Sequence, residues 1–331
     1  MFSGKFRPWG DTSWVLSKID HKLWNFIGCL STEERCTEAV RILKSAGVIN
    51  SNIFFEVLDP VTTVKHTQKI ERNKKTLEAI DSEIGNNIHQ LDLLVEDITL
   101  FNKISEVVNQ SIPNIILDIS TFPKRFFFPF VKTILQHSQV ENLLITYTNA
   151  TKYPESDLSE DPEPWYPLPL FRQTSFPEDQ YDLAIVGTGF MPFSLPKLLK
   201  DKHSKVSLRL MFPFPPGPPN YHRSWEFVRK IEKYYTFKEG DEIIRINSLD
   251  VCEAFDHICS ASNYGEAKVL FAPYGPKPIS LAMCIFASLT GSPVYYTQPK
   301  LYNPDYSTGI KDCISYCIKL DNKLLYSTTD C

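Results

Sequence analysis

The residues of this chain best suited to chemistry gather around two lysines, each placed where a strand turns into a helix. Lys277 lies in Tyr274–Ser280 (YGPKPIS), between an apolar strand and an apolar helix. Free backbone amides and the dipole at a helix N-terminus favour negative charge, and a lysine adds a full positive charge. We therefore expect Gly275, Lys277 and Ser280 to bind an anionic ligand. The alternative is an ordinary strand-to-helix turn with a solvated lysine.

The second lysine, Lys124, follows the strand predicted over 114–120. Asp118 and Ser120 end that strand, and Arg125 comes directly after Lys124. We expect Ser120, Lys124 and Arg125 to contact ligand, because the loops at the carboxyl ends of parallel strands hold the ligands of open α/β sheets. Asp118 is a candidate catalytic carboxylate; alternatively, it forms a structural salt bridge with Lys124 or Arg125.

The two lysine segments also align with each other, which indicates an internal duplication. Identical dipeptides fall at corresponding places in the two halves of the chain. The aligned residues are Pro123–Lys124 with Pro276–Lys277, Tyr147–Thr148 with Tyr296–Thr297, and Tyr153 with Tyr302. Two such halves related by a pseudo-twofold axis would bring both lysine turns towards a shared cleft.

Tyrosines cluster after the last strand of each half. They are Tyr147, Tyr153, Tyr296, Tyr302 and Tyr306. Aromatic rings of this kind stack on nucleic-acid bases, so Tyr296 and Tyr302 are candidate ligand contacts, although ordinary core packing accounts for about half of such rings.

The first strand of each half ends in a short polar loop. In the second half, Gly187–Phe190 (GTGF) makes Thr188 and Gly189 candidate ligand contacts. The loop is an incomplete dinucleotide fingerprint, because Pro192 stands where the third glycine belongs. We therefore expect no nicotinamide cofactor, and no cofactor of any other kind.

The counterpart loop in the first half is 31–35 (STEER). Ser31 and Thr32 are candidate ligand contacts there, and the alternative is that one of them only caps a helix. Glu34 is a candidate for catalysis, as is His222, which follows the rigid proline-rich loop 213–219 and could act as a general base. A surface histidine is the simpler interpretation of His222.

The pattern that positions these residues is an alternation of strands and helices, typical of parallel α/β sheets. We predict two tandem Rossmann-like domains: residues 1–150, an acidic proline-rich linker over 151–180, and residues 181–331. Strands are predicted at 24–30, 53–58, 90–95, 114–120 and 142–148, and in the second half at 182–186, 206–212, 242–246, 268–272 and 294–297. Residues 310–331 are predicted to form edge strands or a closing helix.

Composition bounds the function classes. The 331 residues are 43% hydrophobic and 22% charged, with a net charge of −4, so bulk nucleic-acid binding is not expected. No stretch approaches the roughly 20 apolar residues of a membrane span, and no secretory signal is recognisable at the N-terminus. We expect a cytoplasmic protein. The eight cysteines show no metal-ligand spacing, so we expect buried reduced thiols and no metal site.

The segment around Lys277 resembles the GGTKPM-type motif of the CRISPR-associated Rossmann-fold (CARF) sensor domains of bacterial defence loci. Gly275, Lys277 and Pro278 match, with Ile279 and Ser280 matching loosely, and Pro276 stands in place of the usual threonine. In that family the motif lines a pocket for cyclic oligoadenylates or related nucleotides. The resemblance implies a nucleotide sensor in antiphage defence, and a chain of this length would act through a partner protein or a homo-oligomer.

Two other functions remain open at this point. One is hydrolysis or transfer on a nucleotide or its glycosidic bond, so whether the protein is an enzyme is not decided. The other is a non-catalytic subunit whose Rossmann-like halves bind only protein.

Overall fold

The structure is a computed structural model, and it describes residues 6–19, 22–154, 159–172, 180–190, 192–193, 195, 206–214 and 221–329. The chain divides into two compact units. The first contains Met1–Asp161 and Pro299–Leu325, and the second contains Pro162–Gln298 and Tyr326–Cys331. The sequence prediction assigned residues 299–325 to the C-terminal domain, but their strand pairs with the sheet of the first unit.

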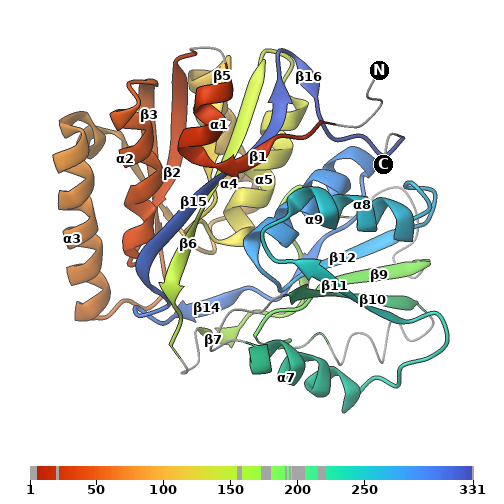
Figure 1. Cartoon of the computed structure of the whole chain (residues 1–331). Helices are drawn as coiled ribbons and strands as arrows, with labels where there is room; N and C mark the ends of the chain where they lie inside the picture. Colours follow the sequence, from red (N-terminus) through yellow and green to blue (C-terminus); the bar gives the residue numbers. More distant parts are fainter. Residues whose placement is uncertain are drawn as a thin grey trace. The chain divides into compact units, whose positions relative to one another are not determined.

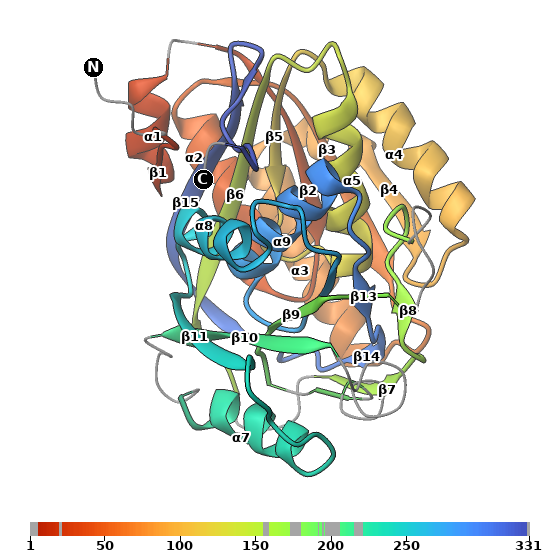
Figure 2. The same ribbon diagram turned by 90° about the vertical axis from the view of Figure 1, so that its right-hand side faces the viewer.

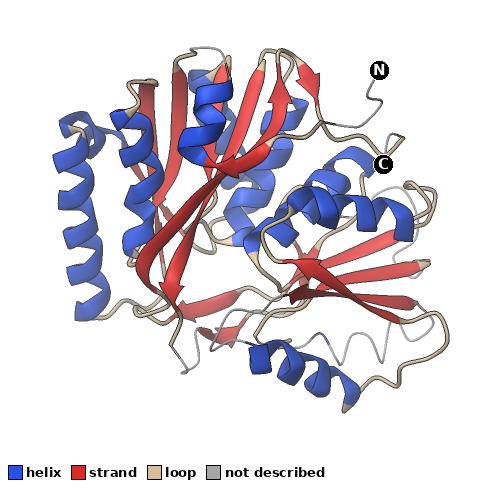
Figure 3. Cartoon of the chain, viewed as in Figure 1, coloured by secondary structure: helices blue, strands red, loops and turns tan. Residues whose placement is uncertain are grey.

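The first unit is built on an eight-stranded sheet, shown in Figure 1 and coloured by secondary structure in Figure 3. The strands run in the order β1-β15-β6-β5-β2-β3-β4, and β16 pairs with β15. They are β1 (Trp9–Asp11), β2 (Trp24–Leu30), β3 (Ile49–Leu58), β4 (Ile88–Asp92), β5 (Asn114–Asp118), β6 (Asn142–Lys152), β15 (Thr308–Leu320) and β16 (Lys323–Leu324). The pairs from β6 to β4 are all parallel. Counted along the chain, these five strands have the order 5-4-1-2-3, which is the Rossmann order 3-2-1-4-5 read from the other edge of the sheet.

Helices cover both faces of this sheet, because every parallel connection needs a crossover. The helices are α1 (Thr12–Lys18), α2 (Glu38–Ser45), α3 (Val64–Ile80), α4 (Asp97–Ser111) and α5 (Lys124–Gln136), with 3-10 turns at η1 (Glu34–Thr37) and η2 (Ser82–Asn87). In Figure 2, α1 and α2 lie on one side of the strands and α4 on the other. Phe54 packs with α2 and α3, whereas its neighbour Phe55 packs with Phe130 of α5. Alternate residues of β3 therefore fill two separate cores.

The long strand β15 returns antiparallel along β6 and lies between β6 and β1. The strand predicted for this part of the chain is confirmed, but it is not an edge strand. A second small pairing joins β14 (Pro299–Tyr302) to β7 (Ser159–Pro162). The chain that follows the second unit is thus tied into the first sheet by backbone hydrogen bonds.

The second unit contains a four-stranded parallel sheet in the order β11-β10-β9-β12. The strands are β9 (Leu183–Gly187), β10 (Ser207–Phe214), β11 (Glu242–Asn247) and β12 (Val269–Pro273), and β8 (Tyr166–Pro167) pairs separately with β13 (Tyr295–Tyr296). Val294 forms a parallel bridge to Phe271 of β12, where a fifth strand would lie. The described helices are α7 (Tyr221–Glu232), α8 (Val251–Ala261) and α9 (Lys277–Thr290).

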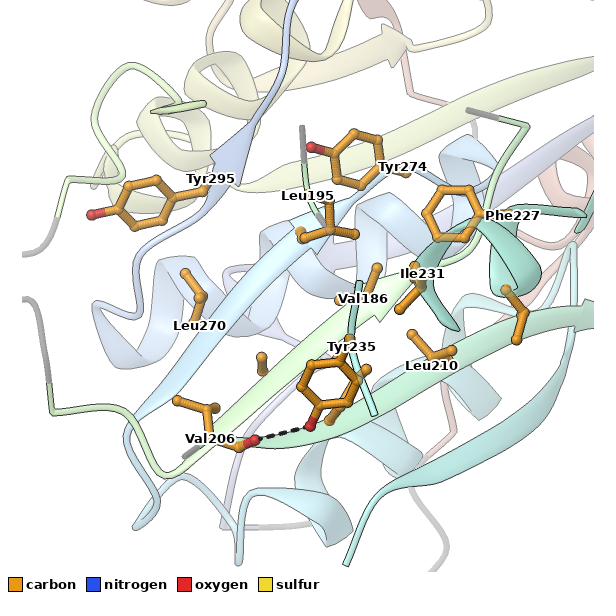
Figure 4. Close-up of a cluster of buried hydrophobic side chains, with 14 of the residues drawn as sticks. Val186, Leu195, Val206, Leu210, Phe227, Ile231, Tyr235, Leu270, Tyr274 and Tyr295 are labelled. Atoms are coloured by element: carbon orange, nitrogen blue, oxygen red, sulfur yellow. Dashed lines mark hydrogen bonds between the residues drawn. The ribbon is translucent and has the colours of Figure 1, made fainter. Parts of the chain in front are cut away.

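The two faces of this sheet are packed by different helices. Figure 4 shows Phe227, Ile231 and Tyr235, from α7 and just beyond it, over strand residues Val186 and Leu210. On the other face, Phe286 of α9 packs against Phe271 and Phe255. Because α9 is apolar nearly all round, ten of its residues are buried, as its composition predicts.

The two units share their strand order and the way one helix begins. In the second unit the order along the chain is 3-2-1-4, as in the first. Pro123 is the N-cap of α5 with φ −57° and ψ 149°, and Pro276 is the N-cap of α9 with φ −53° and ψ 150°. The aligned lysines are therefore the first residues of equivalent helices, as the duplication predicts.

Most predicted strands are confirmed, including β2 at its predicted bounds. The sequence also predicts a helix near 194–200, of which only Leu195 lies within the described residues. Most of the proline loop 213–219 lies outside them, as do residues 155–158 and 173–179 of the linker. No helix in the described ranges is long and apolar enough to cross a membrane.

Free thiols are found at Cys29, Cys36, Cys252, Cys284, Cys313 and Cys317. Cys259 of α8 is disulfide-bonded, so the expectation that all eight thiols are reduced is wrong for this residue. A disulfide depends on the separation of two cysteines in space, which their separation in sequence does not show.

Candidate functional site

In the second unit, the loops after β9 and β12 pack against each other through glycines. A Cβ added to Gly189 would lie 2.0 Å from the carbonyl oxygen of Tyr274, and one added to Gly275 would lie 3.0 Å from the carbonyl oxygen of Thr188. At Gly189 only glycine allows so close an approach of two backbones, and at Gly275 a side chain would require the neighbouring backbone to shift. The glycines that suggested a ligand-facing loop are therefore needed for packing between the two loops.

Thr188 is completely buried and anchors its loop to the next strand. Its backbone amide and its hydroxyl both donate to the carbonyl oxygen of Met211, at 3.0 and 3.1 Å. Ser280 is also buried, and its hydroxyl donates to the carbonyl oxygen of Pro276 at 3.0 Å. Both hydroxyls, expected at the ligand, bond to backbone carbonyls in this structure.

The start of α9 is partly exposed at this edge, because Pro276 and Lys277 are both half-buried. Lys277 is half-buried at the first helical position, and no side chain caps the helix. The positive end of the helix dipole and the lysine charge therefore lie together at the carboxyl end of β12, as predicted.

Aromatic residues lie next to the start of α9. The ring of Tyr274 lies 5.4 Å from that of the half-buried Tyr296 and 6.3 Å from that of Trp165, which stacks on Tyr295. The Tyr274 hydroxyl shares a 2.7 Å hydrogen bond with the hydroxyl of Thr297. Burial raises the pKa of Tyr274 above its ordinary value, so this phenol stays neutral and acts as a hydrogen-bonding group.

In the first unit, Asp118 belongs to a buried hydrogen-bond network. Its Oδ1 accepts from the hydroxyl of Ser120 at 2.5 Å and from that of Thr146 at 3.1 Å. The Ser120 hydroxyl in turn accepts from the backbone amide of Thr148 at 2.7 Å. This network joins the ends of β5 and β6, and both Asp118 and Ser120 are 0% exposed. Lys124 is buried as well.

The guanidinium of Arg125 binds groups of a neighbouring loop. Its Nη2 donates to the carbonyl oxygen of Val95 and to the carboxylate of Asp97, both at 2.7 Å. The guanidinium therefore holds the connection between β4 and α4, next to the edge at which ligand contact was expected.

The loop after β2 is also engaged within the unit. The Ser31 hydroxyl accepts from the backbone amide of Glu33 at 3.3 Å, and Thr32 is half-buried. Neither residue caps η1, whose N-cap is Glu33. Glu34 pairs with Arg72 of α3 at 3.1 Å and accepts from the backbone amide of Gly309.

The remaining candidates, His222 and Tyr302, belong to other elements. His222 is exposed in the first turn of α7 in the second unit, and Tyr302 is half-buried at the end of β14 in the first.

Arg35 is a buried charge that sequence reasoning did not single out. Its guanidinium pairs with Glu33 at 2.9 Å and donates to the carbonyl oxygen of Thr148 at 2.9 Å, with only 3% of the side chain exposed. It also lies over the ring of Tyr147, 5.6 Å from the centroid. Burial opposes the charge, but Glu33 and nearby tyrosines outweigh it and raise the pKa of Arg35. The feature of the sequence that could have indicated Arg35 is the polar run 31–35, which directly follows a buried strand.

Within the described part of the chain, no cluster of His, Cys, Asp or Glu could hold a metal ion. Asp118 and Glu34 both serve as partners of other protein groups in the first unit.

Comparisons with known proteins identify no family. No family model and no curated protein matches the chain. Among solved structures, a universal stress protein from Pseudomonas aeruginosa UCBPP-PA14 is similar with a TM-score of 0.25 and 12% identity, covering 84% of this chain and 94% of that one. A ketoreductase from the first module of phoslactomycin biosynthesis in Streptomyces sp. HK803 is similar with a TM-score of 0.21 and 8% identity, covering 86% and 67%. The α/β fold thus stands on the strand order of the two sheets.

Proposed function

We propose that this protein binds a nucleotide or a similar small anionic ligand at the carboxyl edge of the second sheet, with the ligand's phosphate at the start of α9. The observation that carries the proposal is the placement of Lys277 as the first residue of a helix without a side-chain cap. Backbone amides, the helix dipole and one ammonium group all favour an anion there.

The aromatic residues beside this position support a nucleotide over a simple inorganic anion. Tyr296 is half-buried and packs against Tyr274, so one face of a base could stack on it. The likeness of Gly275–Lys277–Pro278 to the CARF motif supports the same ligand class. On that likeness, the protein is a sensor in antiphage defence and signals through a partner protein or a second copy of itself.

Lys124 is the counterpart of Lys277 at the start of α5. It is buried, and Asp118 and Ser120 beside it bond to other groups of the first unit. The primary site is therefore in the second unit. A phosphate contact by Lys124 would require the segments that bury it in the first unit to open.

A thermal unfolding screen with a panel of mono-, di- and cyclic nucleotides tests the proposal. A ligand selective for the folded state raises the melting temperature by mass action. We expect at least one nucleotide to stabilise the wild type, Lys277→Ala to lose most of the shift, and Lys233→Ala, at an exposed lysine of the same unit, to keep it. The proposal fails if Lys277→Ala keeps the full shift.

The same samples separate the two alternatives. If chromatography shows that the protein converts the stabilising nucleotide to a product, the protein is an enzyme. The absence of any nucleotide effect, together with stable co-purification of one other protein, would favour a protein-binding subunit.

A further inference from the structure

A short segment of the first unit, Tyr302–Gly309, is held by residues far from it in sequence. We call it the strap. It runs from the last residue of β14 to the second residue of β15, and its partners lie on α3 and in the loop after β2. Gly309, at its end, has φ +75°, a backbone conformation that glycine adopts without strain.

The outer contacts of the strap are with α3. The ammonium groups of Lys65 and Lys69 both pair with the carboxylate of Asp305, and Lys69 also donates to the carbonyl oxygen of Pro304 at 2.8 Å. His66 contacts the carbonyl oxygen of Tyr302 at 3.0 Å. The two lysines are four residues apart and share one face of the helix.

These ion pairs are partly exposed. The side chains of Lys65, Lys69 and Asp305 are 55%, 24% and 39% exposed. Ion pairs in water each contribute little and are screened by salt. The outer fastening of the strap is therefore sensitive to ionic strength.

The inner contacts reach the buried arginine. The Ser307 hydroxyl donates to the carboxylate of Glu33, the same group that pairs with Arg35. The ring of Tyr306 lies 6.3 Å from that of Tyr153, and both tyrosines contribute to raising the pKa of Arg35. The strap therefore borders the Glu33–Arg35 pair.

We propose that the strap is a releasable cover over Arg35, closed by the ionic contacts of Asp305 with α3. Release exposes a guanidinium at the carboxyl ends of β2 and β6, where α/β sheets bind ligands. Guanidinium binds carboxylates and phosphates through paired hydrogen bonds. The inference concerns access to the first unit and does not depend on Lys277 or on the ligand proposed for the second.

Two probes on the intact chain test the cover. Hydrogen exchange followed by mass spectrometry reports opening of residues 302–309, and modification by a dicarbonyl reagent reports access to Arg35. We expect Asp305→Asn to speed exchange of the strap amides severalfold, as the loss of two partly exposed ion pairs allows, and to increase Arg35 modification to a similar degree. Asp312→Asn removes an exposed carboxylate of β15 outside the strap and is expected to match the wild type.

A salt series provides the test without a variant. Raising sodium chloride from about 0.05 M to about 0.5 M shortens the screening length more than twofold, so it is expected to open the strap in the wild type and to add little in Asp305→Asn. Peptides of β5 and α5 serve as the folding control and are expected to stay protected. Strap exchange that is unchanged by both treatments, or an opened strap with Arg35 still unmodified, overturns the proposal.

Discussion

At the scale of single residues, burial decides which side chains are chemically available. Cys36, Cys313 and Cys317 have their thiol pKa raised to about 12 by burial. Asp59, at the end of β3, has its pKa raised to about 6 by burial, with the nearby His66 opposing the shift. Both effects come from removing a charged form from water.

The raised pKa of Asp59 predicts a pH-dependent stability. A carboxyl group whose folded-state pKa is raised holds its proton more tightly when folded, so its ionisation costs stability as pH rises from about 4 through about 6. We expect Asp59→Asn to raise the free energy of unfolding by about 1 kcal/mol at pH 8, with partial exposure limiting the gain, and by nothing at pH 4. Denaturant unfolding at the two pH values measures this. An equal effect at both would contradict the shift.

The buried thiols are expected to be inert. Thiolate is the reactive form, so at pH 7.5 Cys36, Cys313 and Cys317 should resist a maleimide in the folded protein and react fully after unfolding. Cys252, which is half-buried, is expected to react first. Peptide mapping by mass spectrometry locates the label, and rapid native labelling of Cys36 would show that the core around it opens.

At the scale of elements, apolar periodicity was sufficient to predict most strands and helices, because the parallel sheets bury them on both faces. The roles of the loop residues were not predictable. The need for glycine at position 189 comes from the close approach of the Tyr274 backbone, which lies far along the chain. In the same way, the position of β15 beside β6 is a long-range antiparallel pairing that no local pattern encodes.

The loop contact gives a prediction at this scale. Gly189→Ala places a methyl group against the backbone carbonyl of Tyr274, which cannot move aside alone. We expect a loss of roughly 3 kcal/mol in the free energy of unfolding. Gly85→Ala is the matched control, because its new methyl group meets only the flexible end of Glu78, and its cost is expected to stay below about 1 kcal/mol. Equal costs in denaturant unfolding would contradict the packing role.

At the scale of the whole molecule, the sequence indicated two Rossmann-like halves, and the structure has two units with the same strand order. The dipeptide alignment placed Lys124 and Lys277 at equivalent helix starts, and this is confirmed. Lys124 is buried whereas Lys277 is half-buried. This difference was not predictable from the sequence, because burial depends on how many other segments pack around each helix start. The shared cleft stays a prediction.

The most direct measurement of the central claim is a calorimetric titration of the stabilising nucleotide into wild type, Lys277→Ala and Lys233→Ala. Loss of a charge-assisted phosphate contact of about 1.5–3 kcal/mol is expected to weaken binding by Lys277→Ala at least tenfold, with Lys233→Ala unchanged. Equal affinities for all three proteins would contradict an anion site at the start of α9.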